Sequence, residues 1–180
     1  MRTFVAVEIS NESVLNSIAK LQSELHITGK AISKENMHFT LFFLGEISEE
    51  TVQKVMESLG TVSFNPIELD LVGLGAFPNP RSPRIVWMGV DDSASRYLIE
   101  LAKQVEDKLR PLGFRSDKPF RPHLTIFRIK NRINDISREL DRYKGVQIGH
   151  ETISELKFKK SILTPDGSVY SDLQVVKAKQ

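Results

Sequence analysis

Two short segments of the sequence carry the same pair of potentially reactive side chains. His38 and Thr40 stand two residues apart in the run HFTL, and His123 and Thr125 stand two residues apart in the run HLTI. Because side chains alternate between the faces of a β-strand, each segment would place an imidazole beside a hydroxyl on one face and apolar side chains on the other. Either segment alone is typical of an ordinary half-buried strand, but the repetition favours a shared chemical role.

Two imidazoles and two hydroxyls suit a displacement at phosphorus. In an in-line attack, one neutral imidazole deprotonates the nucleophile while one imidazolium protonates the leaving oxygen on the opposite side. Histidine populates both states near neutral pH because its ordinary pKa is about 6.5. The hydroxyls of Thr40 and Thr125 could donate hydrogen bonds to the non-bridging oxygens, whose charge the site must stabilise. This chemistry needs no metal and no cofactor.

Other reaction classes have weaker support in the sequence. A metal site is the first alternative, but the chain has no cysteine, no acidic residue stands beside either motif histidine, and His-x-Thr matches no familiar ligand spacing. The G-x-S-x-G motif of serine hydrolases is absent, and so is the P-loop motif of NTP-dependent enzymes. We therefore expect neither a bound metal nor a cofactor.

The spacing of apolar residues predicts the elements that must position these segments. The two motifs begin dense strand patterns over residues 37–44 and 123–129, and further strands are expected near 4–9, 66–74 and 84–90 and within 146–176. Helical spacing is found between residues 11 and 29 and over 48–60, 93–112 and 134–143. The sequence TPDG at 164–167 predicts a hairpin turn, and three prolines within 77–83 predict a loop. This order predicts one α+β domain over residues 1–180.

A weak internal repeat runs through this pattern. Each motif strand is followed within several residues by a helix, and the strands and helix between the two motifs are roughly what each half contains. The repeat predicts two similar lobes that face each other, each with one His-x-Thr strand.

The motifs and their surroundings resemble the 2H phosphoesterase superfamily, and within it the RNA 2′,3′-cyclic phosphodiesterases, also called 2′-5′ RNA ligases. The resemblance covers nearly the whole chain. It is carried by the runs MRTFVAVEIS, HFTLFFLGEI, GAFPNPRSPRIVWMGV, PFRPHLTIFRIK and KKSILTPDGSVYSDL.

The resemblance implies a bilobed α+β fold with two pseudo-symmetric lobes, each with a mainly antiparallel sheet and helices, and an active-site groove between them. It also implies hydrolysis of RNA 2′,3′-cyclic phosphate ends to 2′-phosphomonoesters. His38 and His123 carry over as general acid and base, in an order that the sequence does not decide, and Thr40 and Thr125 as phosphate binders. The partner would be RNA, with tRNA halves as one candidate. Joining of such ends to 5′-hydroxyl RNA and a non-catalytic RNA-binding role are the alternatives.

Arg128 is a further candidate for binding the substrate phosphate, because these enzymes often have an arginine five residues after the second histidine. Strict alternation places its side chain on the face opposite His123 and Thr125. Either a β-bulge or the end of the strand re-aims it, or it is an ordinary solvated arginine. The first motif has Phe43 at the equivalent position.

Three aromatic residues are candidates for stacking on the terminal base of an RNA: Phe77, Phe120 and Tyr170. For Phe77, packing in the core is the alternative interpretation. We expect Trp87 to pack in the core as well.

The charged residues are nearly balanced, with 25 Lys and Arg against 23 Asp and Glu in 180 residues. Basic residues gather between Arg115 and Arg132 and again at Lys157, Lys159 and Lys160, where they could attract an RNA backbone or simply be solvated. A chain that is 40% hydrophobic and free of cysteine is typical of neither a disordered protein nor a disulfide scaffold. With no apolar run long enough for a membrane span and no signal segment visible, we expect a cytoplasmic protein without a membrane or an obligate protein partner.

Overall fold

The computed structural model describes residues 1–130 and 134–180, so Arg132 of the predicted basic stretch lies outside the described residues. Within them, the strands form two antiparallel sheets. Sheet A has the order β3 (His38–Glu46), β1 (Arg2–Glu8), β8 (Glu155–Thr164) and β9 (Gly167–Lys177). Sheet B has the order β2 (Lys30–Ala31), β6 (Leu124–Arg128), β5 (Ile85–Val90), β4 (Ile67–Phe77) and β7 (Gln147–Ile153).

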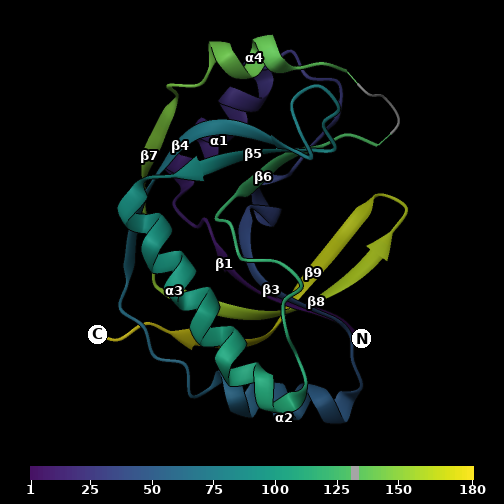
Figure 1. The fold of residues 1–180 in the computed structure, drawn as a ribbon, viewed down its shortest axis with the longest axis vertical. Coiled ribbons are helices and arrows are strands. Elements are labelled where there is room, and N and C mark those ends of the chain that lie inside the picture. Colours follow the sequence, from purple (N-terminus) through teal and green to yellow (C-terminus); the bar gives the residue numbers. More distant parts are fainter. Residues whose placement is uncertain (131–133) are drawn as a thin grey trace.

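This arrangement confirms the predicted α+β fold, with one His-x-Thr segment on each sheet. The two sheets do not, however, divide the chain into halves. Strands β8 and β9 come from the C-terminal part of the chain and join the N-terminal strands β1 and β3 (Figure 1). The short N-terminal strand β2 pairs with β6. The sequence pattern did not predict β2, which has only two residues.

The three longer helices begin within one residue of their predicted starts. The side chains of Asn11, Ser48 and Asp91 accept hydrogen bonds from backbone N–H groups of the first turns, which satisfies donors that a helix leaves unpaired. These caps start α1 (Glu12–Glu24), α2 (Glu49–Leu59) and α3 (Asp92–Leu109). A fourth helix, α4 (Ser137–Arg142), is shorter than predicted, and single 3₁₀ turns span Lys34–Asn36 and Arg110–Leu112. None of the described helices combines the length and apolar character that crossing a membrane requires.

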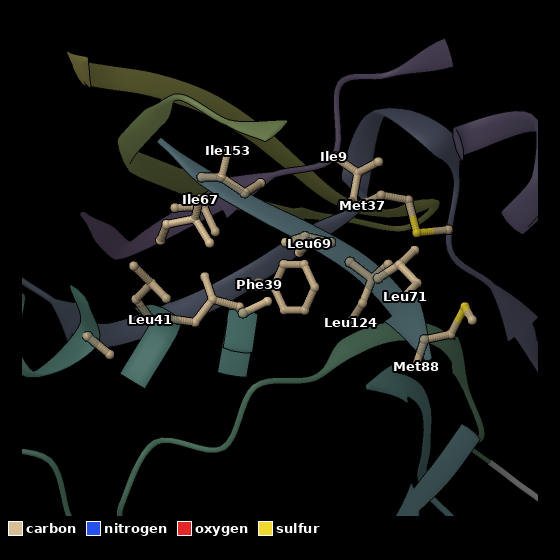
Figure 2. Packing of buried hydrophobic residues seen from close by; sticks show 14 of the residues in the cluster. Ile9, Met37, Phe39, Leu41, Ile67, Leu69, Leu71, Met88, Leu124 and Ile153 are labelled. Atoms are coloured by element: carbon tan, nitrogen blue, oxygen red, sulfur yellow. The ribbon is translucent and has the colours of Figure 1, made fainter. Parts of the chain in front are cut away.

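The apolar residues of the two motif strands meet in one shared core. Phe39 and Leu41 of β3 and Leu124 of β6 are almost completely buried, and they pack around Leu69 and Leu71 of β4 (Figure 2). Burying a side chain of this size contributes roughly 1.5–3 kcal/mol. The core therefore holds both motif strands from behind and leaves their histidines and threonines on the opposite face.

Helices connect the sheets as well as covering them. Helix α3 contacts β3 of sheet A and β4 of sheet B, and it runs along one side of the molecule in Figure 1. Helix α1, although it follows β1 of sheet A, packs against β7 and β6 of sheet B. The two motif strands are thus held relative to each other by helices as well as by the common core.

One strand boundary near the site differs from the sequence prediction, and one predicted turn is confirmed. Strand β4 continues to Phe77, the residue at which the prediction began a loop. The predicted hairpin turn at 164–167 is confirmed, since β8 ends at Thr164 and β9 begins at Gly167. Gly167 has a φ of 129°, which side-chain-bearing residues rarely adopt, and the Thr164 hydroxyl donates to its carbonyl oxygen at 2.7 Å.

Candidate active site

A groove of about 540 Å³ brings the two motifs together. His38 and Thr40 of sheet A line it together with His123 and Thr125, which lie just before and within β6 of sheet B. This volume lies in the range of ordinary small-molecule sites. Two segments far apart in the sequence therefore present their imidazoles and hydroxyls to one space.

Both imidazoles are held in the same way by the backbone. Nδ1 of His38 lies 2.8 Å from the carbonyl oxygen of Asn36, and Nδ1 of His123 lies 2.7 Å from the carbonyl oxygen of Arg121. A carbonyl oxygen only accepts hydrogen bonds, so Nδ1 must carry the proton and donate it. In the neutral ring, Nε2 is then unprotonated and available to accept a proton in the reaction.

Each histidine also has two aromatic neighbours. The ring of His38 lies 5.2 Å from Phe4 and 5.3 Å from Tyr170, measured between ring centroids. The ring of His123 lies 5.0 Å from Phe77 and 6.3 Å from Trp87. These four contacts come from different strands, which restricts the rotation of both imidazoles and is the second feature that the two half-sites share.

The surroundings lower the pKa of both histidines. For His38, burial is the largest cause and brings the pKa to about 4, with the positive charges of Lys159 and Arg128 acting in the same direction. For His123, burial again comes first, followed by the charges of Arg121 and Arg128. The hydrogen bonds to the backbone carbonyls oppose these shifts without cancelling them. The lowered pKa values favour the neutral form of both rings in the free protein at pH 7.

Arg128 reaches the groove because β6 has a bulge. Thr125 pairs with Trp87 and Phe127 pairs with Val86, so Ile126 is an extra residue in the ladder between β6 and β5. The extra residue returns Arg128 to the face of Thr125, and its side chain lines the groove. Of the possibilities that the sequence left open, the bulge is the one found.

The first motif has the same irregularity at the same place. Thr40 pairs with Ala6 and Phe42 pairs with Val5, which leaves Leu41 as the extra residue of β3. Phe43 then occupies the position equivalent to Arg128. Its side chain is 53% exposed and the guanidinium of Arg2 lies 5.2 Å from its ring centre, so the two half-sites differ here in both charge and shape.

The three candidate stacking residues fall into two groups. Tyr170 lines the groove beside His38. Phe77 packs between Trp87, at a centroid distance of 5.2 Å, and the guanidinium of Arg121, at 5.4 Å, while Phe120 packs against the core. Neither of these last two is among the residues that line the groove.

The prediction for Trp87 was wrong. This residue is only partly buried and lies outside the hydrophobic core, on the face of sheet B that carries Thr125. Its indole sits close over Gly75 of the neighbouring strand and next to His123. Thr125 and Trp87 are paired across β6 and β5, so they share a face of sheet B. The sequence alone does not show which strands pair, and so it could not predict this facing of Trp87.

For Lys157 and Lys159, the structure shows neither of the two alternatives that the sequence left open, attraction of RNA and simple solvation. The ammonium of Lys157 lies 2.7 Å from a carboxylate oxygen of Glu8 and 3.2 Å from one of Asp172, and Lys159, 6% exposed, forms ion pairs with both acids. Burial raises the pKa of Glu8, but the two ammonium groups outweigh it and lower the pKa overall. These lysines tie β1, β8 and β9 together rather than presenting free charge.

Within residues 1–130 and 134–180, no three histidine or acidic side chains gather in a way that could hold a metal ion.

Comparison with known proteins agrees with this geometry. The family described as LigT-like phosphoesterases matches residues 7–87 and 89–170. The RNA 2′,3′-cyclic phosphodiesterase of Archaeoglobus fulgidus is 41% identical over 97% of this chain and 99% of its own, and that of Methanocaldococcus jannaschii is 35% identical over 94% and 96%. The crystal structure of Escherichia coli LigT complexed with 3′-AMP superposes with a TM-score of 0.80 at 25% identity, covering 99% of this chain and 98% of that one. The chain belongs to the LigT-like phosphoesterase family of the 2H superfamily.

Proposed function

We propose that the protein hydrolyses RNA 2′,3′-cyclic phosphate ends to 2′-phosphomonoesters by acid–base catalysis between His38 and His123, without a metal ion. The observation that carries this proposal is that both imidazoles, each with Nδ1 bound to a backbone carbonyl, line one groove together with Thr40 and Thr125. The relatives matched over nearly their whole length are named RNA 2′,3′-cyclic phosphodiesterase, which supports the choice of substrate.

The proposed step balances with one water molecule. One histidine accepts a proton from the water through Nε2 as the water oxygen attacks phosphorus. The bond from phosphorus to the 3′-oxygen breaks, and the other histidine, in its protonated form, gives its proton to that oxygen. The free protein favours neutral histidines, so the histidine that acts as the acid takes up its proton as the anionic substrate binds, because a nearby negative charge raises the pKa of an imidazole.

Thr40, Thr125 and Arg128 have a supporting role in this proposal. The two hydroxyls donate hydrogen bonds to the non-bridging oxygens of the phosphate, and the guanidinium offers a charged donor pair on the side of His123. Charge develops on these oxygens in the transition state, so donors that are already in place lower the barrier.

The first test is product analysis of an oligoribonucleotide that ends in a 2′,3′-cyclic phosphate, with EDTA present. We expect a 2′-phosphomonoester, identified by ³¹P NMR, and turnover that EDTA does not change. His38→Ala and His123→Ala should each lower kcat by at least about 100-fold, the usual contribution of a general acid or base. His150→Ala is the matched control, because His150 forms surface ion pairs with Glu68 and Asp70 outside the groove. Full activity in either motif variant would contradict the mechanism.

A second test separates the acid from the base. In a cyclic phosphate whose 3′-oxygen is replaced by sulfur, the leaving thiolate departs without a proton, so the variant that lacks the acid should regain activity. We expect one of the two alanine variants to be rescued and the other to stay inactive. Rescue of both variants, or of neither, would show that one histidine does not act as the acid while the other acts as the base.

The product analysis also tests the two alternatives, RNA joining and non-catalytic RNA binding. Adding an RNA with a 5′-hydroxyl tests for joining, the reverse reaction, which we expect to be minor because no nucleotide hydrolysis drives it. The two halves of a cleaved tRNA serve as a substrate pair with a 2′,3′-cyclic phosphate on one half and a 5′-hydroxyl on the other. Salt-sensitive RNA binding without any turnover would instead favour a non-catalytic binding module.

A further inference from the structure

The tip of the β8–β9 hairpin extends beyond the rest of sheet A. Strand β1 pairs with β8 from Ala6 to Arg2, the latter opposite Ser161. In the described part of the chain, the residues of β8 after Ser161 pair with β9 alone, up to the turn between Thr164 and Gly167. Figure 1 shows this two-stranded end, in yellow, standing away from the other strands.

Apolar side chains are exposed on this hairpin tip. Ile162 is 49% exposed, Leu163 66% and Val169 55%. Residues directly opposite in an antiparallel ladder share a face, so Ile162 and Val169 lie together on one face. Leu163, opposite Ser168, shares the other face with Tyr170, which is opposite Ser161. Leu163, Val169 and Tyr170 all line the groove, whereas Ile162 is not among its lining residues.

The hairpin tip is also held toward sheet B. The ammonium of Lys30, on β2, donates a hydrogen bond to the backbone carbonyl of Asp166 in the turn. A Cβ at Gly167 would lie 2.8 Å from the same ammonium, so the absence of a side chain there permits this approach. The apolar side of the hairpin is therefore fixed beside the groove rather than left free in solution.

Basic residues also line the groove. They are Lys30, Arg128 and Lys130, and the acidic residues of the lining are Glu35 and Asp166, whose backbone carbonyl accepts the hydrogen bond from Lys30. Cations attract the phosphates of a single-stranded nucleic acid, and an apolar surface beside them receives its bases by removing apolar area from water.

We infer that the hairpin tip and this basic lining bind the RNA strand that precedes the cyclic end. Resting on the proposed function, this inference makes an oligonucleotide a better substrate than a mononucleotide. The base of the nucleotide before the cyclic end packs on Leu163, and the phosphate that joins the two nucleotides faces Lys30 and Lys130. The terminal nucleotide itself lies deeper in the groove, beside Tyr170 and the two histidines.

The test compares two substrates that share the same terminal nucleotide: adenosine 2′,3′-cyclic phosphate and a tetranucleotide ending in that group. We expect kcat/KM to be about tenfold or more higher for the tetranucleotide, because the contact between a base and Leu163 removes apolar surface from water. Leu163→Asp should lower the tetranucleotide value about tenfold more than the mononucleotide value. Ile162→Asp, on the opposite face of the same hairpin, should leave both values at the wild-type level.

Two outcomes would overturn the inference: equal kcat/KM for the two substrates in the wild type, or equal effects of the Leu163 and Ile162 substitutions. Matching far-UV circular dichroism and melting temperature of the two variants show that both are folded. Hydrolysis of the mononucleotide by the wild type reports on the proposed function separately, so a failure of that function and a failure of the hairpin subsite give different results.

Discussion

Arg128 shows how one residue gives the two similar half-sites different chemistry. It follows a bulge in β6, and Phe43 follows the corresponding bulge in β3. The guanidinium lies close enough to affect the pKa of both His38 and His123, so its charge acts on the whole groove. A neutral ring at Phe43 has no such effect.

Replacing Arg128 with Gln should lower kcat/KM for a cyclic-phosphate substrate by about 10- to 100-fold. The reason is the loss of a charge-assisted hydrogen bond to the phosphate, which is worth about 1.5–3 kcal/mol. Arg128→Lys should recover part of the activity, because it restores the charge without the paired donors. Steady-state kinetics measure these changes. Arg96→Gln, on the exposed side of α3, is the control, and an Arg128→Gln enzyme as active as that control would remove Arg128 from the site.

The low pKa of His38 should make the folded state sensitive to acid. Its folded value of about 4 lies below the ordinary value of 6.5, so between these two pH values the unfolded chain binds a proton that the folded chain does not. Stability is therefore lost as the pH falls from 6.5 toward 4, by at most about 3 kcal/mol from this one group.

Urea unfolding of the wild type and of His38→Gln between pH 7 and pH 4 measures this loss. The difference in the free energy of unfolding between the two proteins should shift in favour of the variant as the pH falls. His150→Gln should show the opposite trend, because ion pairing with Asp70 and Glu68 raises the pKa of His150. Parallel curves for wild type and His38→Gln would mean that the imidazole is not desolvated in the folded protein.

At the scale of the elements, the pairing between strands places residues that the pattern along one strand cannot. The alternation in HFTL and HLTI correctly predicted which side chains face the core, because that pattern is local. The facing of Arg128 depends on a bulge, which exists only in the ladder with β5. Likewise, Lys157 and Lys159 look like a free basic cluster until β1 and β9 bring Glu8 and Asp172 beside them.

Gly75 of β4 gives a test of how the strands hold His123. A Cβ at this position would lie 2.2 Å from the indole of Trp87, so Gly75→Ala must push that ring away from the strand and disturb its contact with His123. We expect a loss of about 1–3 kcal/mol of stability from overpacking, together with reduced kcat. The fluorescence of the chain's single tryptophan should shift as well.

Gly145→Ala is the matched control for this substitution, because a Cβ there would meet no atom within 4 Å. Thermal unfolding and kinetics of both variants make the comparison. If Gly75→Ala destabilised the protein but kept wild-type kcat, the indole would be a packing residue without influence on His123.

For the whole molecule, we propose that residues 1–180 form a single folding unit. The strands of the two sheets share one core, and α3 contacts both sheets. The C-terminal strands β8 and β9 lie in one sheet with the N-terminal strands β1 and β3, and the N-terminal strand β2 lies in the other sheet, with later strands. Among the described residues, the buried apolar side chains of both sheets belong to one cluster. Such interleaving predicts one cooperative transition.

Urea unfolding followed by Trp87 fluorescence, which reports on sheet B, and by far-UV circular dichroism should give coincident curves. Leu41→Ala, in sheet A, should shift both curves equally, by about 2–5 kcal/mol for a buried leucine. A shift in the dichroism curve alone, with the Trp87 curve unmoved, would indicate two independently unfolding parts.

The near-equivalence of the two half-sites has a consequence for regioselectivity. Two identical half-sites related by a twofold axis would accept a cyclic ester in either of two orientations, and each orientation would expel a different ring oxygen. Each histidine bonds through Nδ1 to a backbone carbonyl and packs against an aromatic ring, so the histidine pair does not favour one of these orientations over the other. The difference between Arg128 and Phe43 does distinguish the two orientations, because only one side of the groove then carries this positive charge. We therefore expect this mismatch, rather than the histidine pair, to determine which hydroxyl of the ribose is released.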